Sequence, residues 1–342
     1  MNDRSTIRRH VLAGLLGLSA ATSLGGIRLA RAETAVASTD PDFAAWLKKL
    51  RAEAKTRGIS DATLDAALSG VTPNARVIEL DRKQPEKTMT FAQYIERVVP
   101  EERVVEGRLR FAANADLLGK VSQRFGVEPQ YIVALWGIES DFGRRMGSFS
   151  VIEALVTLAY DGRRSAYFRR ELLDALTILE QGHIAPANML GSWAGAMGQA
   201  QFMPSSFLGH AYDFDGDGRR DIWSSPGDVF ASAAKYLSDI GWRNGEGWGR
   251  AVRLPASLNA SQAAADEKGR SLGRWHALGV RAAIDASWPD HRSKKNARLV
   301  LPGGGASPAY LVFYNFDVIL RWNRSTYFAV AVGQLADRIA GR

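Results

Sequence analysis

Hydrophobic side chains recur at helical spacing over much of the chain after residue 40. One predicted helix face carries Phe43, Trp46, Leu47, Leu50 and Ala54. Gly58 is placed to end this helix, and Ser60 is placed to cap a second one. The helical spacing resumes over residues 91–125. The pattern predicts an N-terminal helical domain over residues 33–125.

A different pattern begins after Trp248. The preceding segment, about residues 126–245, is helical between glycine-rich and aspartate-rich loops. Short apolar runs rich in β-branched residues then indicate strands, at residues 250–254, 297–301 and 310–313. The final stretch, 327–339, is helical again. The chain is therefore predicted to be α-rich (α+β), a helical body with one small inserted β domain.

The first 32 residues differ from the rest of the chain. The segment begins with basic residues and continues with an apolar run over residues 11–26. It ends at residues 30–32 with two small residues on either side of an arginine. This arrangement is typical of an export signal, cleaved here after Ala32. The Arg8-Arg9 pair is typical of twin-arginine export, although ordinary signals carry such pairs too. A membrane anchor is the alternative, and a run interrupted by Arg28 fits it less well.

Composition narrows the location and the partners. No later stretch is long and apolar enough to span a bilayer, so cleavage predicts a protein released into the periplasm. Cysteine is absent, which excludes disulfides, zinc-thiolate sites, cysteine nucleophiles and a lipid on an N-terminal cysteine. No oligomerisation signal is present, so a monomer is expected.

The charge indicates an anionic polymer as partner. The formal net charge is +8, and residues 1–32 contribute five arginines and one aspartate, so +4 remains for residues 33–342. Mild positive charge suits the cell wall. Nucleic acid is not expected as a partner, because the chain is exported and carries no basic-aromatic stripe or nucleic-acid motif.

One carboxylate stands out at the end of an apolar segment. Pro129 begins a predicted helix, and residues 131–138 are apolar on every side, which predicts a buried helix. Glu139 follows on the same face as Leu135 and Trp136. Apolar surroundings raise the pKa of a carboxyl group, as a general acid near neutral pH requires. Glu139 is therefore the candidate catalytic residue.

A structural role for Glu139 is the alternative. Arg144 or Arg145 could pair with it at the helix end, and structural pairs also perturb carboxylates. A second carboxylate is not evident either, because Asp141, two residues on, points elsewhere on a helix. Glycosidases normally use two carboxylates, so a single acid implies a different design.

Several ordered segments carry a family resemblance. They are Phe43-x-x-Trp46, QPE at Gln84–Glu86, GIESDFGRRMG at Gly137–Gly147, DGRRSAYF at Asp161–Phe168, GSWAGAMGQAQFMPSSF at Gly191–Phe207, DFDGDGRRDIW at Asp213–Trp223 and RWNRSTYFAVAV at Arg321–Val332. Together they resemble the lytic murein transglycosylases of the membrane-bound B type and their soluble relatives (glycoside hydrolase family 103-like). Each motif alone is weak, but the ordered set spans nearly all of the chain after the signal.

The resemblance implies a fold and a reaction. It implies a lysozyme-like helical core with an N-terminal helical domain and a small β domain. The expected division is 1–32 signal, 33–125 N-terminal helices, 126–248 catalytic core, 249–313 β domain and 314–342 C-terminal helix returning to the core. The implied lyase cleaves the β-1,4 bond between N-acetylmuramic acid and N-acetylglucosamine without water or cofactor. Glu139 would act first as acid and then as base, giving a 1,6-anhydromuramoyl product.

Cleft residues follow from the same resemblance. Ser192 and Gln201 match family residues that lie in the cleft, while Phe202 and Met203 are expected as wall or core. Tyr236 matches a cleft tyrosine, although its helical spacing alone predicts a core residue.

Two further segments supply the remaining candidates. Asn323 and Tyr327 match a family segment that borders the acid. Arg163 and Arg164 are candidates for the muramoyl peptide or its lactyl carboxylate. The alternative for this arginine pair is a solvated helix face, and the sequence does not decide between the two.

An aspartate-rich loop resembles the start of an EF-hand-type calcium site. Its pattern consists of Asp213, Asp215, Asp217, Gly218 in the sixth position and Asp221 in the ninth. The backbone carbonyl of Arg219 would be a further ligand in this first part of the loop. Ser224 replaces the acid expected at position twelve, and Asp228 is the later candidate that the family's longer loop implies. A structural Ca²⁺ is predicted, and an acidic turn without metal, offset by Arg219 and Arg220, is the alternative.

Two other functions fit the same residues. A hydrolytic muramidase on this scaffold would use water in place of the sugar 6-hydroxyl. A non-catalytic wall-binding scaffold would not need Glu139. Peptidoglycan glycan strands are the expected partner in each case, and the sequence leaves open whether proteins of a wall-synthesis complex also bind.

Overall fold

The computed structural model describes residues 40–83, 89–283, 294–305 and 307–341. The predicted signal, 1–32, and the QPE segment at 84–86 lie outside the described residues. Within the described ranges, no helix is long and apolar enough to cross a membrane.

The first helices begin where the sequence places caps. They are α1 (Pro41–Thr56), α2 (Asp61–Leu68) and α3 (Ala75–Arg82). The side chain of Asp40 accepts from the Asp42 backbone N–H at 2.9 Å, and that of Ser60 accepts from Thr63 N–H at 3.2 Å. Each cap satisfies a backbone donor that the first helical turn leaves unpaired. The predicted cap at Ser60 is confirmed.

The helical pattern over residues 91–125 forms three helices instead of one continuous run. They are α4 (Phe91–Val98), α5 (Glu101–Ala113) and α6 (Ala115–Phe125). Pro100 has no N–H and disfavours helical backbone in the residue before it, which separates α4 from α5. Asn114 separates α5 from α6, with its side-chain amide donating to the Arg110 carbonyl at 2.8 Å.

Helix α7 lies at the centre of the helical body. It runs from Pro129 to Ser140, and every residue from 131 to 140 is buried. The other helices after residue 140, outside the β domain, are α8 (Val151–Tyr160), α9 (Ser165–Glu180), α10 (Pro204–His210), α11 (Pro226–Asp239), α14 (Tyr314–Trp322) and α15 (Thr326–Ile339). Helices α5, α6, α11 and α15 pack directly on α7. The prediction of a buried helix is confirmed.

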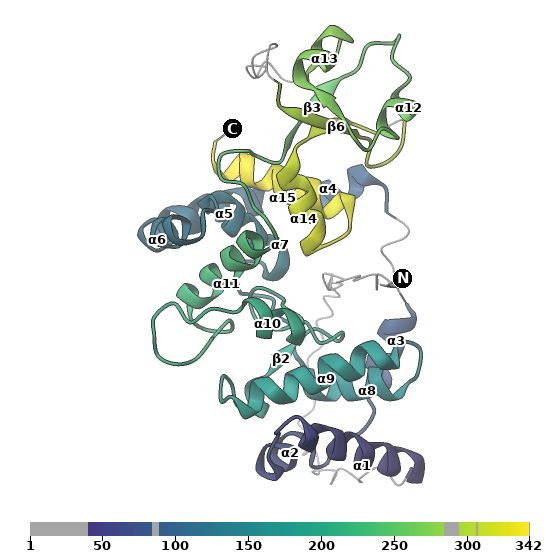
Figure 1. Ribbon diagram of the computed structural model, residues 1–342, viewed down its shortest axis with the longest axis vertical. Helices are drawn as coiled ribbons and strands as arrows, with labels where there is room; N and C mark the ends of the chain where they lie inside the picture. The colour runs from purple at the N-terminus through teal and green to yellow at the C-terminus, as the bar shows by residue number, and fades with distance from the viewer. Residues whose placement is uncertain (1–39, 84–88, 284–293, 306, 342) are drawn as a thin grey trace, which may run out of the picture.

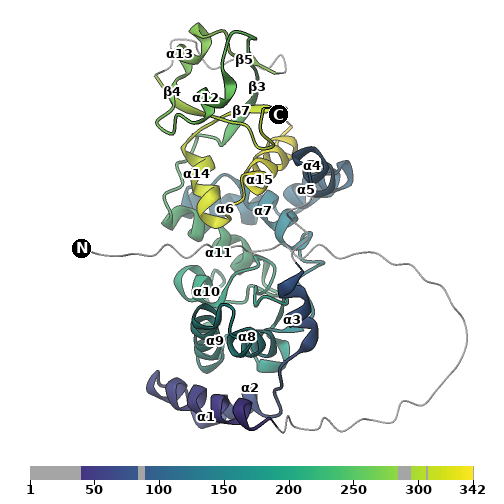
Figure 2. The same cartoon turned by 90° about the vertical axis from the view of Figure 1, so that its right-hand side faces the viewer.

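The helices before residue 126 divide between two groups. Helices α2 and α3 pack against α9 and α8 at one end of the molecule, whereas α4, α5 and α6 pack against α15, α7 and α11 (Figures 1 and 2). The range 33–125, expected as one helical unit, therefore contributes to both groups. A two-stranded pair, β1 (Phe149–Ser150) with β2 (Leu190–Gly191), joins the segment after α7 to the loop that follows α9.

The small sheet lies at the other end of the long axis (Figure 1). Its strands are β3 (Gly249–Arg253), β4 (Arg270–Ser271), β5 (Arg281–Ala282), β6 (Asn296–Val300) and β7 (Ala309–Val312), ordered β4-β6-β7-β3-β5 and all antiparallel. With α12 (Ala260–Ala264) and α13 (Leu272–Ala277) it encloses a separate apolar cluster around Trp275. The predicted α-rich (α+β) fold with a small inserted β domain is confirmed.

Candidate active site

Glu139 lies in the last turn of α7 with only 7% of its surface exposed. Its Oε1 accepts a hydrogen bond from the indole Nε1 of Trp322 at 2.7 Å, from the end of α14. Burial raises the pKa of the Glu139 carboxyl to about 7, and the indole hydrogen bond opposes that rise because it stabilises the charged form. A carboxyl group with a pKa near neutrality can both donate and recover a proton.

The neighbouring arginines pair with a different carboxylate. Asp141 follows α7 in the left-handed conformation, with φ of 53°, and caps the helix. Its carboxylate lies 3.2 Å from Arg144, 3.5 Å from Arg145 and 3.7 Å from Arg103. The arginine pair therefore neutralises Asp141, and the pairing with Glu139 considered from the sequence is not the arrangement found. Among the described residues, no second carboxylate contributes to the pKa shift of Glu139.

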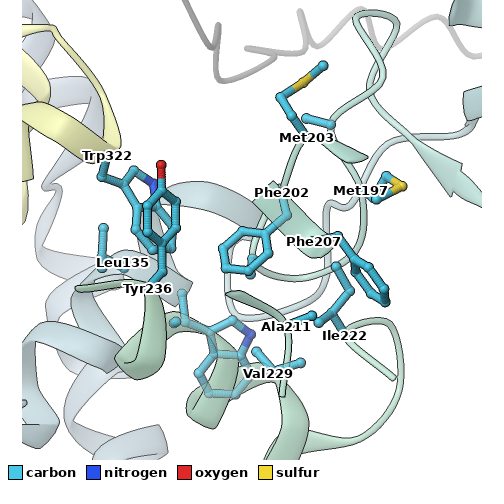
Figure 3. Close-up of a cluster of buried hydrophobic side chains, with 14 of the residues drawn as sticks. Leu135, Met197, Phe202, Met203, Phe207, Ala211, Ile222, Val229, Tyr236 and Trp322 are labelled. Carbon is cyan, nitrogen blue, oxygen red and sulfur yellow. The ribbon is translucent and has the colours of Figure 1, made fainter. Parts of the chain in front are cut away.

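Aromatic rings surround the indole that contacts Glu139 (Figure 3). The Tyr236 ring stacks on Trp322 with centroids 4.8 Å apart and planes inclined by 28°. Phe202 meets both rings edge-on, at 5.5 Å from Tyr236 and 5.4 Å from Trp322. Both Phe202 and Met203 are buried, as expected. Tyr236 is buried, as its helical spacing predicts, and it lies one ring away from the candidate acid, whereas its place in the cleft stays a prediction.

A narrow pocket contains Glu139, and its walls are mostly apolar. The lining residues are Ile132, Leu135, Trp136, Gln199, Ala200, Val229, Phe230, Ala233 and Trp322. Gln199 is fixed there, since its Oε1 accepts from Trp136 Nε1 and its Nε2 donates to the Trp223 carbonyl, both at 2.8 Å. Sequence reasoning missed both Gln199 and Trp322. Gln199 lies within the GSWAGAMGQAQFMPSSF segment and Trp322 within RWNRSTYFAVAV, but neither segment indicates what these side chains contact.

Ser192 and Gln201 shape the loop between β2 and α10. The Ser192 hydroxyl accepts from the Ala196 backbone N–H at 3.0 Å. The Gln201 amide donates to the Met146 carbonyl at 2.9 Å, which ties this loop to the segment after α7. Gly147 lies beside the same loop with φ of +92°, and an added Cβ would overlap the carbonyl of Gly191. The structure therefore brings residues 146–147 and 191–201 together.

Arg163 and Arg164 both bind the buried carboxylate of Asp81 in α3. Arg163 Nε donates to Asp81 Oδ2 at 2.9 Å, and Arg164 donates to Oδ1. The pair precedes α9 and links it to α3, so it is neither a free cationic patch nor a merely solvated face. The Arg163 side chain nevertheless remains 51% exposed.

Asn323 and Tyr327 lie on either side of the turn between α14 and α15. Asn323 is buried beside Trp322, and its side-chain oxygen accepts from the Ser325 N–H at 3.0 Å. Tyr327 packs edge-on against Phe91, with centroids 5.2 Å apart. Asn323 therefore sits next to the residue that contacts the acid, whereas Tyr327 packs on α4.

The aspartate loop joins α10 to α11. Asp213, Asp215 and Asp217 each place a carboxylate oxygen within 4.8 Å of the others. Hard oxygen donors at this separation fit Ca²⁺, which tolerates irregular cages. The loop's acids also accept its own backbone N–H groups, for example Gly218 N–H to Asp213 at 2.9 Å.

The later two acids of the loop bind backbone in the structure. Asp228, buried in α11, accepts from Phe214 N–H at 2.8 Å and from Asp221 N–H at 2.6 Å, and burial raises its pKa. Asp221 accepts from the Ser224 N–H at 2.8 Å. Arg219 lies over the loop, 3.7 Å from the Asp217 carboxylate. Asp228 therefore anchors the loop to α11, in addition to its predicted role as a ligand.

Known proteins share this architecture. Residues 42–337 match the family described as Transglycosylase SLT domain. The membrane-bound lytic murein transglycosylase B of Escherichia coli strain K12 is 33% identical over 259 residues, which cover 73% of this chain and 67% of the relative. SltB3 of Pseudomonas aeruginosa, solved in complex with NAG-NAM-pentapeptide, superposes with a TM-score of 0.84 and 45% identity over 88% of this chain and 80% of that one.

A calcium complex is also among the similar structures. The lytic transglycosylase Slt35 of Escherichia coli, solved in complex with calcium, has a TM-score of 0.70 and 28% identity. The match covers 88% of this chain and 93% of that one. The similarity therefore extends over most of both chains.

Proposed function

This chain belongs to the Transglycosylase SLT domain family and is a lytic murein transglycosylase, a lyase acting on peptidoglycan, and we propose that Glu139 is its single acid and base. The observation that carries the proposal is the burial of Glu139 with a pKa of about 7 beside one neutral hydrogen-bond donor. Its protonated form is then populated near neutral pH, as the first step requires. No cofactor is needed for this chemistry.

The proposed reaction uses Glu139 twice. Protonated Glu139 first donates to the glycosidic oxygen between N-acetylmuramic acid and N-acetylglucosamine, and the C1–O bond breaks. The muramoyl 6-hydroxyl then bonds to C1, and its proton passes to the Glu139 carboxylate, which restores the acid. The substrate's own acetamido group stabilises the positive charge at C1, as in substrate-assisted glycosidases. Between the two steps, the Trp322 indole N–H stabilises the carboxylate.

The proposed cleft follows the loop that Ser192 and Gln201 shape. The side chains of Ser192 and Gln201 fix the backbone of residues 191–201 beside the end of α7. We therefore assign these two residues to the wall of a sugar-binding subsite, where they would shape the subsite and contact the sugar. We assign Asn323 to the part of the cleft next to the acid. Tyr236 is assigned to the layer behind Trp322, and Tyr327 to the border of the same C-terminal segment. We assign Arg163 and Arg164 to a carboxylate of the muramoyl substituent, through the exposed part of the Asp81-bound pair.

Activity is expected to fall as pH rises through about 7, because Glu139 must be protonated before it can donate. Protonated Glu139 predominates below that pH and is lost above it. The measurement is the initial rate of anhydromuramoyl product release from about pH 5 to about pH 9, at substrate concentrations well below KM, where the rate follows the pKa of the free enzyme. A rate that stays constant across neutral pH would contradict the assignment of the group to Glu139.

We propose a structural Ca²⁺ in the aspartate loop. The ligands assigned are Asp213, Asp215 and Asp217, the carbonyl of Arg219, and the acids Asp221 and Asp228. The cluster of three carboxylates supports this assignment, since acids this close repel one another unless a cation neutralises them. The ion would hold the connection between α10 and α11, and it takes no part in the chemistry.

Removal of calcium is expected to lower the melting temperature by several degrees. Ca²⁺ at about 100 times its Kd stabilises the folded state by about 2.7 kcal/mol. The measurement is thermal unfolding with excess Ca²⁺ and with EDTA. A variant with Asp215→Asn and Asp217→Asn is the control, because its melting temperature should not respond to either addition. A wild-type curve that EDTA leaves unchanged would favour the acidic turn without metal.

We propose that the protein acts in the periplasm after export and cleavage behind Ala32, which the sequence of residues 1–32 supports. Export through the twin-arginine route rests on Arg8-Arg9 alone. Its proposed partner is the glycan strand of peptidoglycan, on which it would act as a monomer. N-terminal sequencing of the mature protein tests the cleavage site.

A further inference from the structure

The indole that contacts Glu139 lies where its own helix ends. Trp322 is the last residue of α14, and Asn323 continues in extended backbone with φ of −141° and ψ of 121°. Glu139 and Trp322 are 183 residues apart in the chain. A helical side chain leans back onto the turn before it, so α14 and the groups that pack against the ring together set the direction of the indole N–H.

A column of rings packs against that indole. Tyr236 covers Trp322 with its ring 4.8 Å away (Figure 3). His210 covers the Tyr236 ring in turn, with centroids 4.2 Å apart and planes inclined by only 5°. The three rings come from α14, α11 and α10, so the column connects three helices to the acid on α7. Phe202 closes the side of the column with edge-on contacts.

The outer ring of the column is itself held in place. His210 Nδ1 lies 2.7 Å from Asp239 Oδ2, and the same carboxylate oxygen accepts from Lys235 Nζ at 2.5 Å. Asp239 is three residues beyond Tyr236 on α11, so both lie on the face of the helix toward His210. The His210 side chain is 24% exposed, whereas Tyr236 and Trp322 are buried. The column therefore runs from the surface to Glu139.

We propose that His210 is a positioning residue for Glu139, because its ring holds Tyr236 flat against Trp322 and so keeps the indole N–H directed at the carboxylate. The inference rests on the proposed role of Glu139 as the acid. His210 touches neither substrate nor reacting atoms. Its effect falls on the step in which Glu139 becomes charged, since the indole then donates to a carboxylate and the hydrogen bond is strongest.

Three substitutions of His210 distinguish the contribution of its ring from that of its polar contact with Asp239. His210→Ala removes the stack and the bond to Asp239, His210→Phe keeps a flat ring, and His210→Asn keeps a polar group without a ring. Trp322→Phe serves as the benchmark because it deletes the indole N–H. Each variant is assayed for kcat, KM, the pH dependence of kcat and the melting temperature, with purified sacculi as substrate.

We expect His210→Ala to lower kcat by about tenfold with little change in KM, since loss of a hydrogen bond to a charged group has effects of this order. The decline of kcat at high pH should move to higher pH, in the same direction as for Trp322→Phe. The sign follows because the indole hydrogen bond lowers the pKa of Glu139. His210→Phe should retain most of the wild-type kcat and its pH profile, and His210→Asn should resemble His210→Ala.

Other results would overturn the inference. If His210→Ala lowers kcat and the melting temperature together but leaves the pH profile in place, His210 is structural only. The same conclusion follows if His210→Asn behaves as wild type, because the ring would then have no role. The proposed function is tested separately, since only an active Glu139→Gln enzyme would remove Glu139 from the reaction.

Discussion

Glu139→Gln is expected to abolish release of 1,6-anhydromuramoyl products from purified sacculi, which is the largest functional effect that the structure predicts. The amide can neither donate nor recover a proton under these conditions, so the rate falls by at least about 10³-fold. The fold should persist, because Gln keeps an oxygen for the Trp322 indole and removes the cost of burying a carboxylate. Mass spectrometry identifies the product, since an anhydro end lacks one water relative to a reducing end.

Glu128→Gln is a matched control for this experiment. Glu128 precedes α7 at its other end and also accepts a 2.7 Å hydrogen bond from an indole, that of Trp242. It lies outside the pocket that contains Glu139. Its replacement should leave the product and the rate unchanged. Reducing ends released by the wild type would instead indicate a hydrolytic muramidase, and an active Glu139→Gln variant would indicate that another group is the acid.

Phe202→Ala has the largest expected effect on stability. Phe202 is 2% exposed and packs edge-on against Tyr236 and Trp322 (Figure 3). Truncating a buried phenylalanine to alanine removes apolar contacts and leaves a cavity, at a cost of about 3–5 kcal/mol. Activity should fall as well, because the cavity frees Trp322, which hydrogen-bonds to Glu139, and Tyr236, which stacks on Trp322. The change in the free energy of unfolding is measured by urea denaturation, and the rate by product release.

Leu109→Ala is the control for this prediction. Leu109 on α5 is 60% exposed, so its truncation should change stability by no more than about 0.5 kcal/mol. Phe202→Leu should have an intermediate effect, because the branched side chain fills part of the cavity. If Phe202→Ala costs less than about 1 kcal/mol, neighbouring groups collapse into the cavity and the aromatic cluster is less rigid than proposed.

The two predictions affect different properties. Glu139→Gln replaces one carboxyl group by an amide and leaves the packing unchanged. Phe202→Ala changes the packing, and it affects the reaction only because the packing holds Trp322 and Tyr236 in place. A stable, inactive first variant and a destabilised, partly active second variant would therefore separate the acid from its support.

Local sequence patterns determined the elements and the position of the candidate acid. The run from Tyr131 to Ile138 is apolar on every side, and such a helix has no stable position other than the interior. A carboxylate at its end is therefore buried, and burial alone raises its pKa. The cap at Ser60 and the alternation of acids from Asp213 to Asp217 are local in the same sense, since their contacts span only a few residues.

Tertiary structure decided what each polar side chain contacts. Arg144 and Arg145 follow both Glu139 and Asp141 closely in the sequence, and in the structure they pair with Asp141, whose backbone is left-handed. The partners of Arg163 and Arg164 came from α3, about eighty residues earlier. Spacing along the chain carries no information about such pairs, because they depend on how helices are placed and not on how each one forms.

The sequence by itself determined the family, the α-rich fold and a lone acid at the end of a buried helix. Only the tertiary structure decided that Trp322 hydrogen-bonds to that acid, and that Tyr236 and His210 continue from it to the surface. The physical reason is the separation along the chain of the residues that interact. Helical periodicity reflects neighbours three and four residues apart, whereas the ring column is formed where α11 packs against α10, α14 and α7. That meeting depends on the folding of the whole chain.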